Sequence, residues 1–304
     1  KSGLPKMRFR GPRNLPITED CLATLRQTRG LTLDLATIPW NDPATFRLLQ
    51  AGDTNGIFQL ESAGLRRLLQ DMRPTSFEDI IAANALFRPG PLEGGLVDQF
   101  VKCKHGDREI VYPHPALEPI LKETYGVIVY QEQVMQIASQ LAGFTLGEAD
   151  VLRAAMGKKK KEEMAKMRVK FITGAGDRGV TEAKATEIFD LMAFFAGYGF
   201  NKSHSAAYAV ISYQTAYLKA NYPLQYLAAL LNNEAGNYDR VAAAVLDCPA
   251  RGIEVLPPAV NRSDAGFSVQ AGKIRYCLPV IKNAAGRGVS LRLTEHPDPG
   301  QSHT

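Results

Sequence analysis

Asparagine, lysine, serine and histidine side chains are gathered in one short loop, Gly197-Tyr198-Gly199-Phe200-Asn201-Lys202-Ser203-His204. The glycines let the loop bend, and a long helical pattern begins near Ser205. Backbone N–H groups and the macrodipole at a helix N-terminus favour an anion such as phosphate. The candidate phosphate ligands are Asn201, Lys202, Ser203 and His204. The alternative is that His204 only caps the helix, and the aromatic residues of the loop could stack on a base or anchor it to the core.

A second candidate is the turn Phe87-Arg88-Pro89-Gly90-Pro91-Leu92, which follows a predicted helix. Two prolines around Arg88 fix the backbone of this turn. A guanidinium held in one direction suits a bidentate phosphate contact. The alternative is a structural arginine that donates to the last carbonyls of the helix, and the sequence favours neither.

A basic run between Val151 and Lys170 holds eight cationic residues against Glu162 and Glu163. The cationic residues are Arg153, Lys158, Lys159, Lys160, Lys161, Lys166, Arg168 and Lys170. Such a cluster is a candidate footprint for a polyanion. On charge alone, a solvated helix face is the stronger interpretation.

Several standard catalytic patterns are absent from the sequence. It contains no Asp-x-Asp pair, so two-metal phosphoryl transfer has no obvious ligand pair in this chain. Gly157-Lys158 resembles the end of a phosphate loop, but Leu152 stands where the earlier glycine is required. The sequence therefore predicts phosphate binding without a catalytic centre of its own.

Helical periodicity dominates the middle of the chain. Caps at Ser76, Thr145 and Thr181 predict helix starts, and apolar residues at three- and four-residue steps follow each of them. Short strands are predicted at Ile57–Leu60 and Gly126–Tyr130, and a hairpin with its turn at Ala271-Gly272. The predicted fold class is mainly α with short β elements, that is, α+β.

The composition is typical of a packed protein, with 45% hydrophobic and 22% charged residues and a formal net charge of +5. Apolar runs fall short of the ~20 residues of a membrane span. Four cysteines without CxxC pairing argue against a zinc site and predict a reducing, cytoplasmic location. Because the chain begins with Lys1 rather than methionine, we expect it to be a fragment of a longer protein.

Five ordered motifs resemble the alpha subunit of bacterial DNA polymerase III, a C-family replicative polymerase. They are Phe58-Gln59-Leu60-Glu61-Ser62, the run from Ala85 to Leu92, the run from Tyr125 to Met135, the run from Arg153 to Lys160, and Gly197–Ser205 with the following Ser212–Thr215 and Leu218–Ala220. The resemblance spans roughly residues 3–281. It implies part of a DNA-directed DNA polymerase, a nucleotidyltransferase of DNA replication, whose palm is polymerase-beta-like.

By this resemblance, residues 1–25 are a remnant of the palm, 26–240 the helical fingers domain, and 241–304 a small β-hairpin element with the truncated start of a helix-hairpin-helix region. The fingers would position the incoming dNTP through Arg88, Asn201, Lys202, Ser203 and His204. The DNA would be contacted by Arg153, Lys158, Lys159, Lys160 and Lys161. The implied partners are primer–template DNA, a dNTP and the remainder of the holoenzyme, including the palm, the sliding clamp and other subunits, with no membrane.

The sequence also departs from the family pattern. Arg8 occupies the position of a palm aspartate, in Lys6-Met7-Arg8-Phe9-Arg10-Gly11-Pro12. Arginine cannot bind Mg²⁺, so that ion is expected for the full-length enzyme and not for this chain. The glycine-rich hairpin of the family is only partly kept at residues 283–288. We therefore expect the fragment alone to be inactive.

Two alternatives to the fingers interpretation remain. One is a non-catalytic helical nucleic-acid-binding module derived from such a polymerase. It differs from the fingers interpretation in that the native protein would have no palm with intact carboxylates. The other is a helical protein-interaction scaffold, for which neutralising Lys158–Lys161 would leave DNA affinity unchanged.

Overall fold

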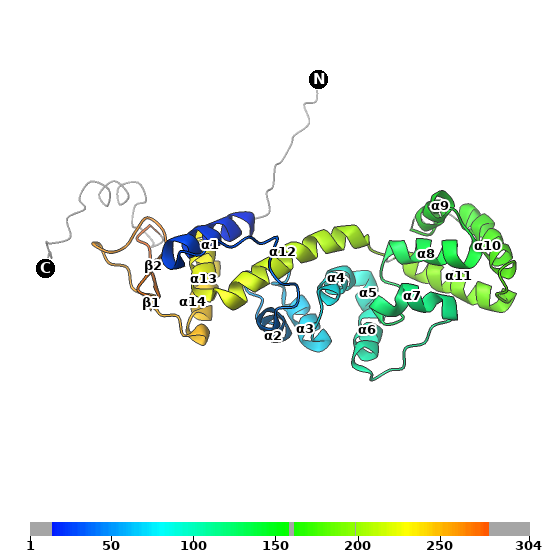
Figure 1. Ribbon diagram of the computed structural model, residues 1–304, viewed down its shortest axis with the longest axis horizontal. Helices are drawn as coiled ribbons and strands as arrows, with labels where there is room; N and C mark the ends of the chain where they lie inside the picture. The colour runs from blue at the N-terminus through cyan, green and yellow to red at the C-terminus, as the bar shows by residue number, and fades with distance from the viewer. Residues whose placement is uncertain (1–13, 158–160, 198, 280–304) are drawn as a thin grey trace, which may run out of the picture. The chain divides into compact units, whose positions relative to one another are not determined.

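The computed structural model describes residues 14–157, 161–197 and 199–279 (Figure 1). Helices account for most of these residues, and the β structure is confined to one small sheet. The predicted fold class is therefore confirmed. None of the helices in the described ranges has the length and apolarity that crossing a membrane requires.

The chain divides into two compact units. Within the described residues, the first unit comprises 14–48, 53–61 and 212–279, and the second comprises 49–52 and 62–211 without the gaps. The predicted boundaries of a palm remnant, a fingers domain and a C-terminal element stay a prediction.

The first unit is built on a helix pair, with the sheet near its C-terminal end. Its elements are α1 (Asn14–Arg29), most of α2 (Pro43–Gln50), the later part of α12 (Lys202–Asn221), α13 (Pro223–Asn233), α14 (Tyr238–Asp247), the short 3-10 helix η3 (Pro249–Arg251), β1 (Val255–Leu256), β2 (Ser268–Gln270) and β3 (Lys273–Arg275). Pro223 lies in the first turn of α13, where proline is tolerated because it lacks only an N–H that would have no helical partner there.

The core of the first unit lies between α1 and α13. Cys21 and Leu25 of α1 are fully buried with Tyr226 and Leu227 of α13. Phe267 and Ile274 of the sheet join the same cluster. One continuous apolar core therefore ties the sheet to the helices of this unit.

The first unit also contains a buried, paired lysine, Lys219 of α12. The side chain of Lys219 is 0% exposed, and its Nζ lies 2.9 Å from Asp53 Oδ1, 2.7 Å from Asp247 Oδ2 and 2.8 Å from the carbonyl oxygen of Asn55. Arg251 also pairs with Asp53. Burial would raise the pKa of Asp53, but the attraction and hydrogen bond of Lys219, helped by Arg251, outweigh it and lower that pKa. A buried cation is tolerated here because it is paired and hydrogen-bonded.

Within its described residues, the second unit contains helices joined by turns and loops, with one isolated β-bridge. Its elements are α3 (Ala63–Met72), α4 (Phe77–Leu86), α5 (Pro89–Glu93), α6 (Leu96–His105), η1 (Pro115–Leu117), α7 (Glu118–Leu121), η2 (Lys122–Thr124), α8 (Gln131–Ala142), α9 (Leu146–Gly157), α10 (Lys161–Gly176), α11 (Glu182–Ala196) and the first part of α12. The predicted capping box at the start of α4 is confirmed, with Ser76 and Asp79 exchanging hydrogen bonds. Lys104 forms a buried ion pair with the same Asp79, at 2.8 Å.

Helices α8 to α11 pack against one another and lie side by side in Figure 1. The predicted apolar stripes form their shared core, where the ring of Phe171 lies 5.6 Å from that of Phe189 and 6.2 Å from that of Phe144. Gly174 of α10 approaches α8 so closely that a Cβ there would lie 2.2 Å from the carbonyl oxygen of Ala142. Only glycine fits at this contact.

Two predicted strands are wrong. Residues Ile57–Leu60 form turns, with Gln59 at φ 62°. The backbone of Phe58 is held by side chains of α12, since its N–H donates to Thr215 Oγ1 and its carbonyl accepts from Ser212 Oγ. Side chains thus satisfy polar groups that a strand neighbour would otherwise satisfy. Gly126–Tyr130 is not a strand either, and only Tyr130 takes part in a single β-bridge.

The predicted hairpin is confirmed, and its second strand, β3, ends at Arg275. β2 and β3 are antiparallel, and the turn residues Ala271 and Gly272 have φ of 49° and 77°. Two positive φ values are typical of the tight turns that match the twist of a hairpin. β1 pairs with β3 in parallel and completes the order β1-β3-β2.

Replacing Lys219 with methionine should lower the free energy of unfolding by roughly 3–5 kcal/mol, because a fully buried cation is removed while its partner Asp247, whose side chain is only 13% exposed, stays largely out of water. Urea unfolding of the chain, followed by circular dichroism, measures this change. Lys273→Met is the control, since its pair with Glu254 is exposed and should contribute less than about 1 kcal/mol. Equal destabilisation of the two variants would contradict the assigned role of Lys219.

Candidate phosphate site at the start of helix α12

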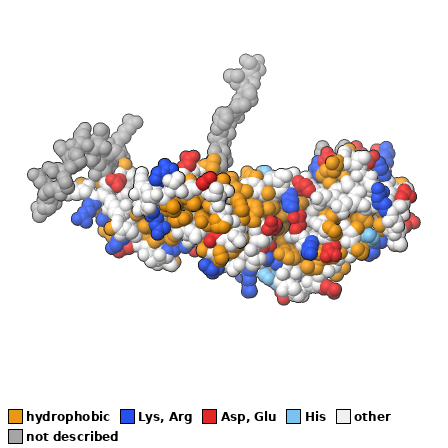
Figure 2. All heavy atoms as spheres, viewed as in Figure 1, with side chains coloured by type: hydrophobic (Ala, Val, Ile, Leu, Met, Phe, Trp, Pro, Cys, Tyr) orange, Lys and Arg blue, Asp and Glu red, His pale blue; other side chains and the backbone are white. Residues whose placement is uncertain are grey.

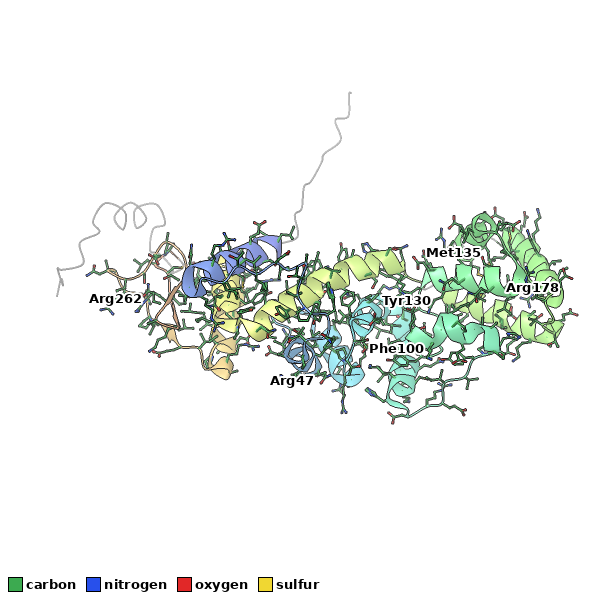
Figure 3. All side chains as sticks on the ribbon, viewed as in Figure 1. Arg47, Phe100, Tyr130, Met135, Arg178 and Arg262 are labelled. Atoms are coloured by element: carbon green, nitrogen blue, oxygen red, sulfur yellow. The ribbon has the colours of Figure 1, made fainter. Side chains whose placement is uncertain are left out.

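Two segments far apart in the sequence meet where α8 and α12 begin. Tyr130, labelled in Figure 3, forms a parallel β-bridge with Phe200. The N–H of Phe200 donates to the carbonyl of Val129 at 3.1 Å, and the N–H of Gln131 donates to the carbonyl of Phe200 at 2.9 Å. The loop before α12 is thus attached by its backbone to the first residues of α8.

Two polar residues at the start of α8 reinforce this attachment with their side chains. Gln131 Nε2 donates to the carbonyl of Gly199 at 3.1 Å. Glu132 accepts from Asn201 Nδ2 at 2.9 Å and from the backbone N–H of Lys202 at 3.0 Å. The two segments are therefore joined by side chains as well as by the backbone.

Gln133 is buried, and its amide is engaged at both ends. Its Oε1 accepts from the N–H groups of Val129 and Tyr130, and its Nε2 donates to the carbonyl of Ile120 and to Thr124 Oγ1. Buried polar groups that are all satisfied in this way make a segment rigid. Gln133 thereby holds the extended segment against which the loop before α12 lies.

The structure places the four residues predicted as phosphate ligands on one loop and the first turn of α12, which begins at Lys202 rather than near Ser205. Asn201 Oδ1 accepts from the N–H of His204 at 2.8 Å, so the cap belongs to Asn201 and not to the His204 side chain. Ser203 is exposed. The imidazole of His204 lies between two rings, 5.5 Å from Phe200 and 4.5 Å from Tyr208.

Carboxylates of this chain already lie at the donors of this helix N-terminus. Glu132 accepts from the first N–H of α12, and Lys202 Nζ pairs with Glu123 at 2.7 Å. The same ammonium lies 5.4 Å from the centre of the Tyr130 ring. Burial, and then the charges of Glu123 and neighbouring acids, raise the pKa of Tyr130, so its hydroxyl stays protonated. The donors of this site favour anionic partners, and the carboxylates of Glu132 and Glu123 bind two of them, the first N–H of α12 and the ammonium of Lys202.

Arg88 lies beside the same loop. Its guanidinium carbon is 4.5 Å from the centre of the Phe200 ring, and its Nε donates to the carbonyl of Ala85 in the last turn of α4 at 2.8 Å. Arg88 thus makes the contact expected of a structural arginine, because it donates to a carbonyl in the last turn of the preceding helix. Partial burial lowers the pKa of Arg88, but a guanidinium remains charged. Phe200 thus contacts a cation and an imidazole.

Arg153 reaches the site from α9. Its Nη1 donates to Gln131 Oε1 at 3.2 Å, and its Nε and Nη2 bind Asp150 Oδ1 at 2.9 Å and 2.8 Å. The predicted capping box of Thr145 and Glu148 starts this helix. Lys170, then Thr145, lower the pKa of the exposed Glu148 to about 2.

The basic run is less cationic in the structure than in the sequence. Arg168 pairs with Asp190, and Lys170 pairs with Glu148. Acidic and basic side chains are interspersed over this part of the surface in Figure 2. Lys158, Lys159 and Lys160 lie outside the described residues, and Lys161 is the first residue of α10. Their predicted contact with DNA stays a prediction.

The described residues do not suit a metal ion, since no group of three or more histidine, cysteine, aspartate or glutamate side chains is placed to hold one. Arg8 lies outside the described residues. No chemical step is therefore assigned to a metal bound by this part of the chain.

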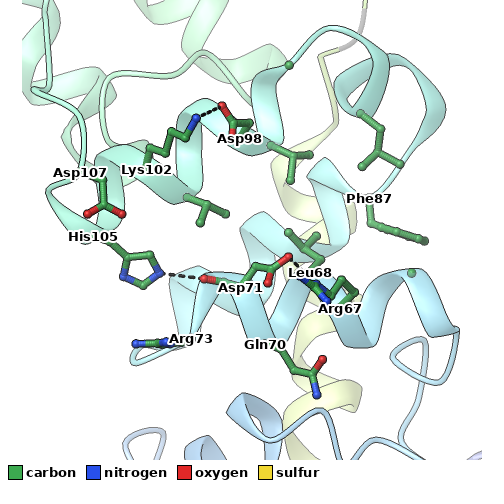
Figure 4. Close-up of a pocket in the computed structure, with 15 residues that line it drawn as sticks. Arg67, Leu68, Gln70, Asp71, Arg73, Phe87, Asp98, Lys102, His105 and Asp107 are labelled. Atoms are coloured by element: carbon green, nitrogen blue, oxygen red, sulfur yellow. Dashed lines mark hydrogen bonds and ion pairs between the residues drawn. The ribbon is translucent and has the colours of Figure 1, made fainter.

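A separate groove of about 880 Å³ lies between α3 and α6 (Figure 4). Its rim carries the ion pairs Arg67–Asp71 and Lys102–Asp98, and His105 Nε2 lies 2.8 Å from the carbonyl of Asp71. Among the residues that line it, none was predicted to bind phosphate or DNA. The candidate site is therefore the arrangement around Phe200 and not this groove.

Comparison with known proteins gives a clear assignment. Residues 14–179 match the model of the bacterial DNA polymerase III alpha subunit finger domain. The chain belongs to this family. It is 48% identical to DNA polymerase III subunit alpha of Thermus aquaticus over 298 residues, which cover 96% of this chain and 24% of that protein. The same subunit of Caulobacter vibrioides is 50% identical, with coverage of 93% and 24%, and that of Bacillus subtilis is 47% identical, with coverage of 92% and 25%.

The predicted family and the fingers region are thereby confirmed. The chain spans about a quarter of the length of these polymerase III alpha subunits. Two of the motifs quoted for the resemblance meet in the structure, since the run that contains Gln131 and Glu132 contacts the run that contains Phe200 and Lys202.

Sequence reasoning missed Gln131, Glu132 and Glu123 as parts of the site. Their partners lie far along the chain, and Glu132 and Asn201 are 69 positions apart. One local signal was available, because a Gln-Glu-Gln triplet at the start of an amphipathic helix places polar groups in its first turn, where N–H donors and a neighbouring segment can use them. That signal does not identify the partner.

Changing Glu132 to glutamine should speed amide exchange at Lys202 about five- to tenfold, because a charged acceptor is replaced by a neutral one at the same place. Hydrogen–deuterium exchange with site-resolved detection measures this. Glu148→Gln removes a carboxylate from the start of α9 and should leave the amide of Lys202 unchanged. An unaltered rate in Glu132→Gln would show that the carboxylate does not hold the start of α12.

Proposed function

We propose that this chain is the fingers part of a DNA-directed DNA polymerase, and that the residues around Phe200 hold the triphosphate of the incoming dNTP. The observation that carries the proposal is the convergence of Arg88 and His204 on the Phe200 ring, at 4.5 Å and 5.5 Å. Arg88 follows α4, whereas His204 belongs to α12, far along the chain. Cationic and polar donors gathered at a helix N-terminus are suited to a polyphosphate.

Binding of a triphosphate requires an exchange of partners. Glu132 and Glu123 now satisfy the first N–H of α12 and the ammonium of Lys202. A triphosphate carries more negative charge than either carboxylate and competes for Lys202, and the exposed side chains of Ser203 and His204 are open to it. The exchange makes binding selective for highly charged ligands.

The DNA contact is proposed for Arg153 of α9 and for the lysines that follow this helix in the sequence. Arg153 is held in place by Asp150 and Gln131, and Lys158, Lys159, Lys160 and Lys161 follow within eight residues. Cations at this density neutralise several phosphates of a primer–template duplex. Phosphate contacts carry no sequence information, which suits a polymerase that must accept any sequence.

The chemical step is assigned to the rest of the protein. No group of three or more histidine, cysteine, aspartate or glutamate side chains gathers in the described part of the chain, and bond formation is proposed for a palm outside it. We propose that the whole protein acts with Mg²⁺ in its palm, with primer–template DNA and with other holoenzyme subunits in the bacterial cytoplasm. The role of the fingers is to bind and orient the triphosphate before reaction.

In the intact subunit, Arg88→Met and His204→Ala should each weaken binding of the next complementary dNTP about tenfold or more, since each removes a charged or polar contact to phosphate. The dissociation constant is measured on a dideoxy-terminated primer–template, where no reaction follows. Arg67→Met is the control, because this arginine is 77% exposed and lies at the separate groove. Unchanged affinity in both site variants would refute the proposed triphosphate site.

Replacing Lys158, Lys159, Lys160 and Lys161 together with methionine should weaken primer–template binding. It should also reduce the slope of log K against log salt by up to about 3.6, at ~0.9 for each phosphate that a lysine no longer neutralises. Fluorescence anisotropy of a labelled duplex across a salt series gives this slope. A slope that does not change would favour a scaffold role for this segment.

A further inference from the structure

We infer that Gln131 is a positioning residue that couples the proposed DNA contact to the proposed triphosphate site, an inference that rests on the proposed function. Its side chain donates to the carbonyl of Gly199 at 3.1 Å and accepts from Arg153 Nη1 at 3.2 Å. Gly199 belongs to the loop of the proposed triphosphate site, and Arg153 of α9 belongs to the proposed DNA contact. Gln131 links these two parts by one amide group.

The chemistry of the contact requires an amide. Gln131 must donate to a carbonyl at one end and accept from a guanidinium at the other. A glutamate would keep the acceptor for Arg153 but would place a second acceptor against the carbonyl of Gly199. Methionine has nearly the same shape and offers neither contact, so it removes the link with little change in packing.

Helix formation by itself gives no reason for glutamine at this position. Gln131 is the first residue of α8, and its backbone N–H already donates to the carbonyl of Phe200. The neighbouring Gln133 supplies the contacts that hold the segment before the helix. The side chain of Gln131 therefore contributes mainly to the arrangement of its two partners.

Arg153 is oriented by this contact. Asp150 binds its Nε and Nη2 at one edge, and Gln131 binds Nη1 at the other. A guanidinium held at two edges loses little further freedom when it binds a phosphate, which favours binding. Movement of the loop at Gly199 changes the position of Gln131, and hence the orientation of Arg153.

The test is a set of variants in the intact subunit, with primer–template affinity and dNTP affinity measured separately. Gln131→Met should weaken DNA binding about threefold and dNTP binding about tenfold, whereas Arg153→Met should weaken DNA binding about tenfold with little effect on dNTP binding. In the double variant, DNA affinity should equal that of Arg153→Met within about twofold, because Gln131 acts on DNA only through Arg153. The affinity for dNTP should stay at the value of Gln131→Met.

Gln136→Met is the matched control, since Gln136 is an exposed residue of the same helix. It should leave both affinities unchanged, and thermal unfolding should show that all variants are folded. The inference is overturned if Gln131→Met changes neither affinity, or if the two reductions in DNA affinity multiply in the double variant. A normal DNA affinity in Arg153→Met would instead refute the proposed role of Arg153, independently of the result for Gln131.

Discussion

The arrangement of the site depends on the attachment of the loop before α12 to the start of α8. The chain enters helices α8 to α11 after Tyr130 and returns beside that residue at Phe200. Without this closure, the first N–H of α12 would lose its carboxylate acceptor and Arg88 would lack its aromatic neighbour. The attachment is made of backbone hydrogen bonds and of side chains from one triplet, so it fixes both the position and the direction of the loop.

The charges around this attachment are balanced rather than purely cationic. Glu132 and Glu123 bind donors proposed to hold the triphosphate, and Asp150 binds the arginine proposed to contact DNA. A triphosphate must therefore replace Glu132 and Glu123, which costs part of its binding free energy and limits non-specific binding of weak anions, whereas Asp150 stays in place and orients Arg153. This balance explains how a basic sequence motif can lie on a surface of mixed charge.

Features set by neighbours in the sequence were predictable, and features set by distant partners were not. The caps at Ser76 and Thr145 and the hairpin turn at Ala271 were predicted correctly because each involves residues within a few positions. Ile57–Leu60 was predicted as a strand because it clusters β-branched and aromatic residues, but side chains 154 and 157 residues away hold its backbone in turns. The loop before α12 was recognisable by its donors, whereas Glu132, which binds two of them, was not.

If the two attached segments bind the incoming nucleotide together, both must respond to it. Hydrogen–deuterium exchange of the intact subunit on a dideoxy-terminated primer–template, with and without the next complementary dNTP, measures this response directly. We expect added protection in residues 199–205 and in residues 129–133, and none with a mismatched dNTP at the same concentration. Protection confined to other regions, or equal protection by both nucleotides, would contradict the shared site.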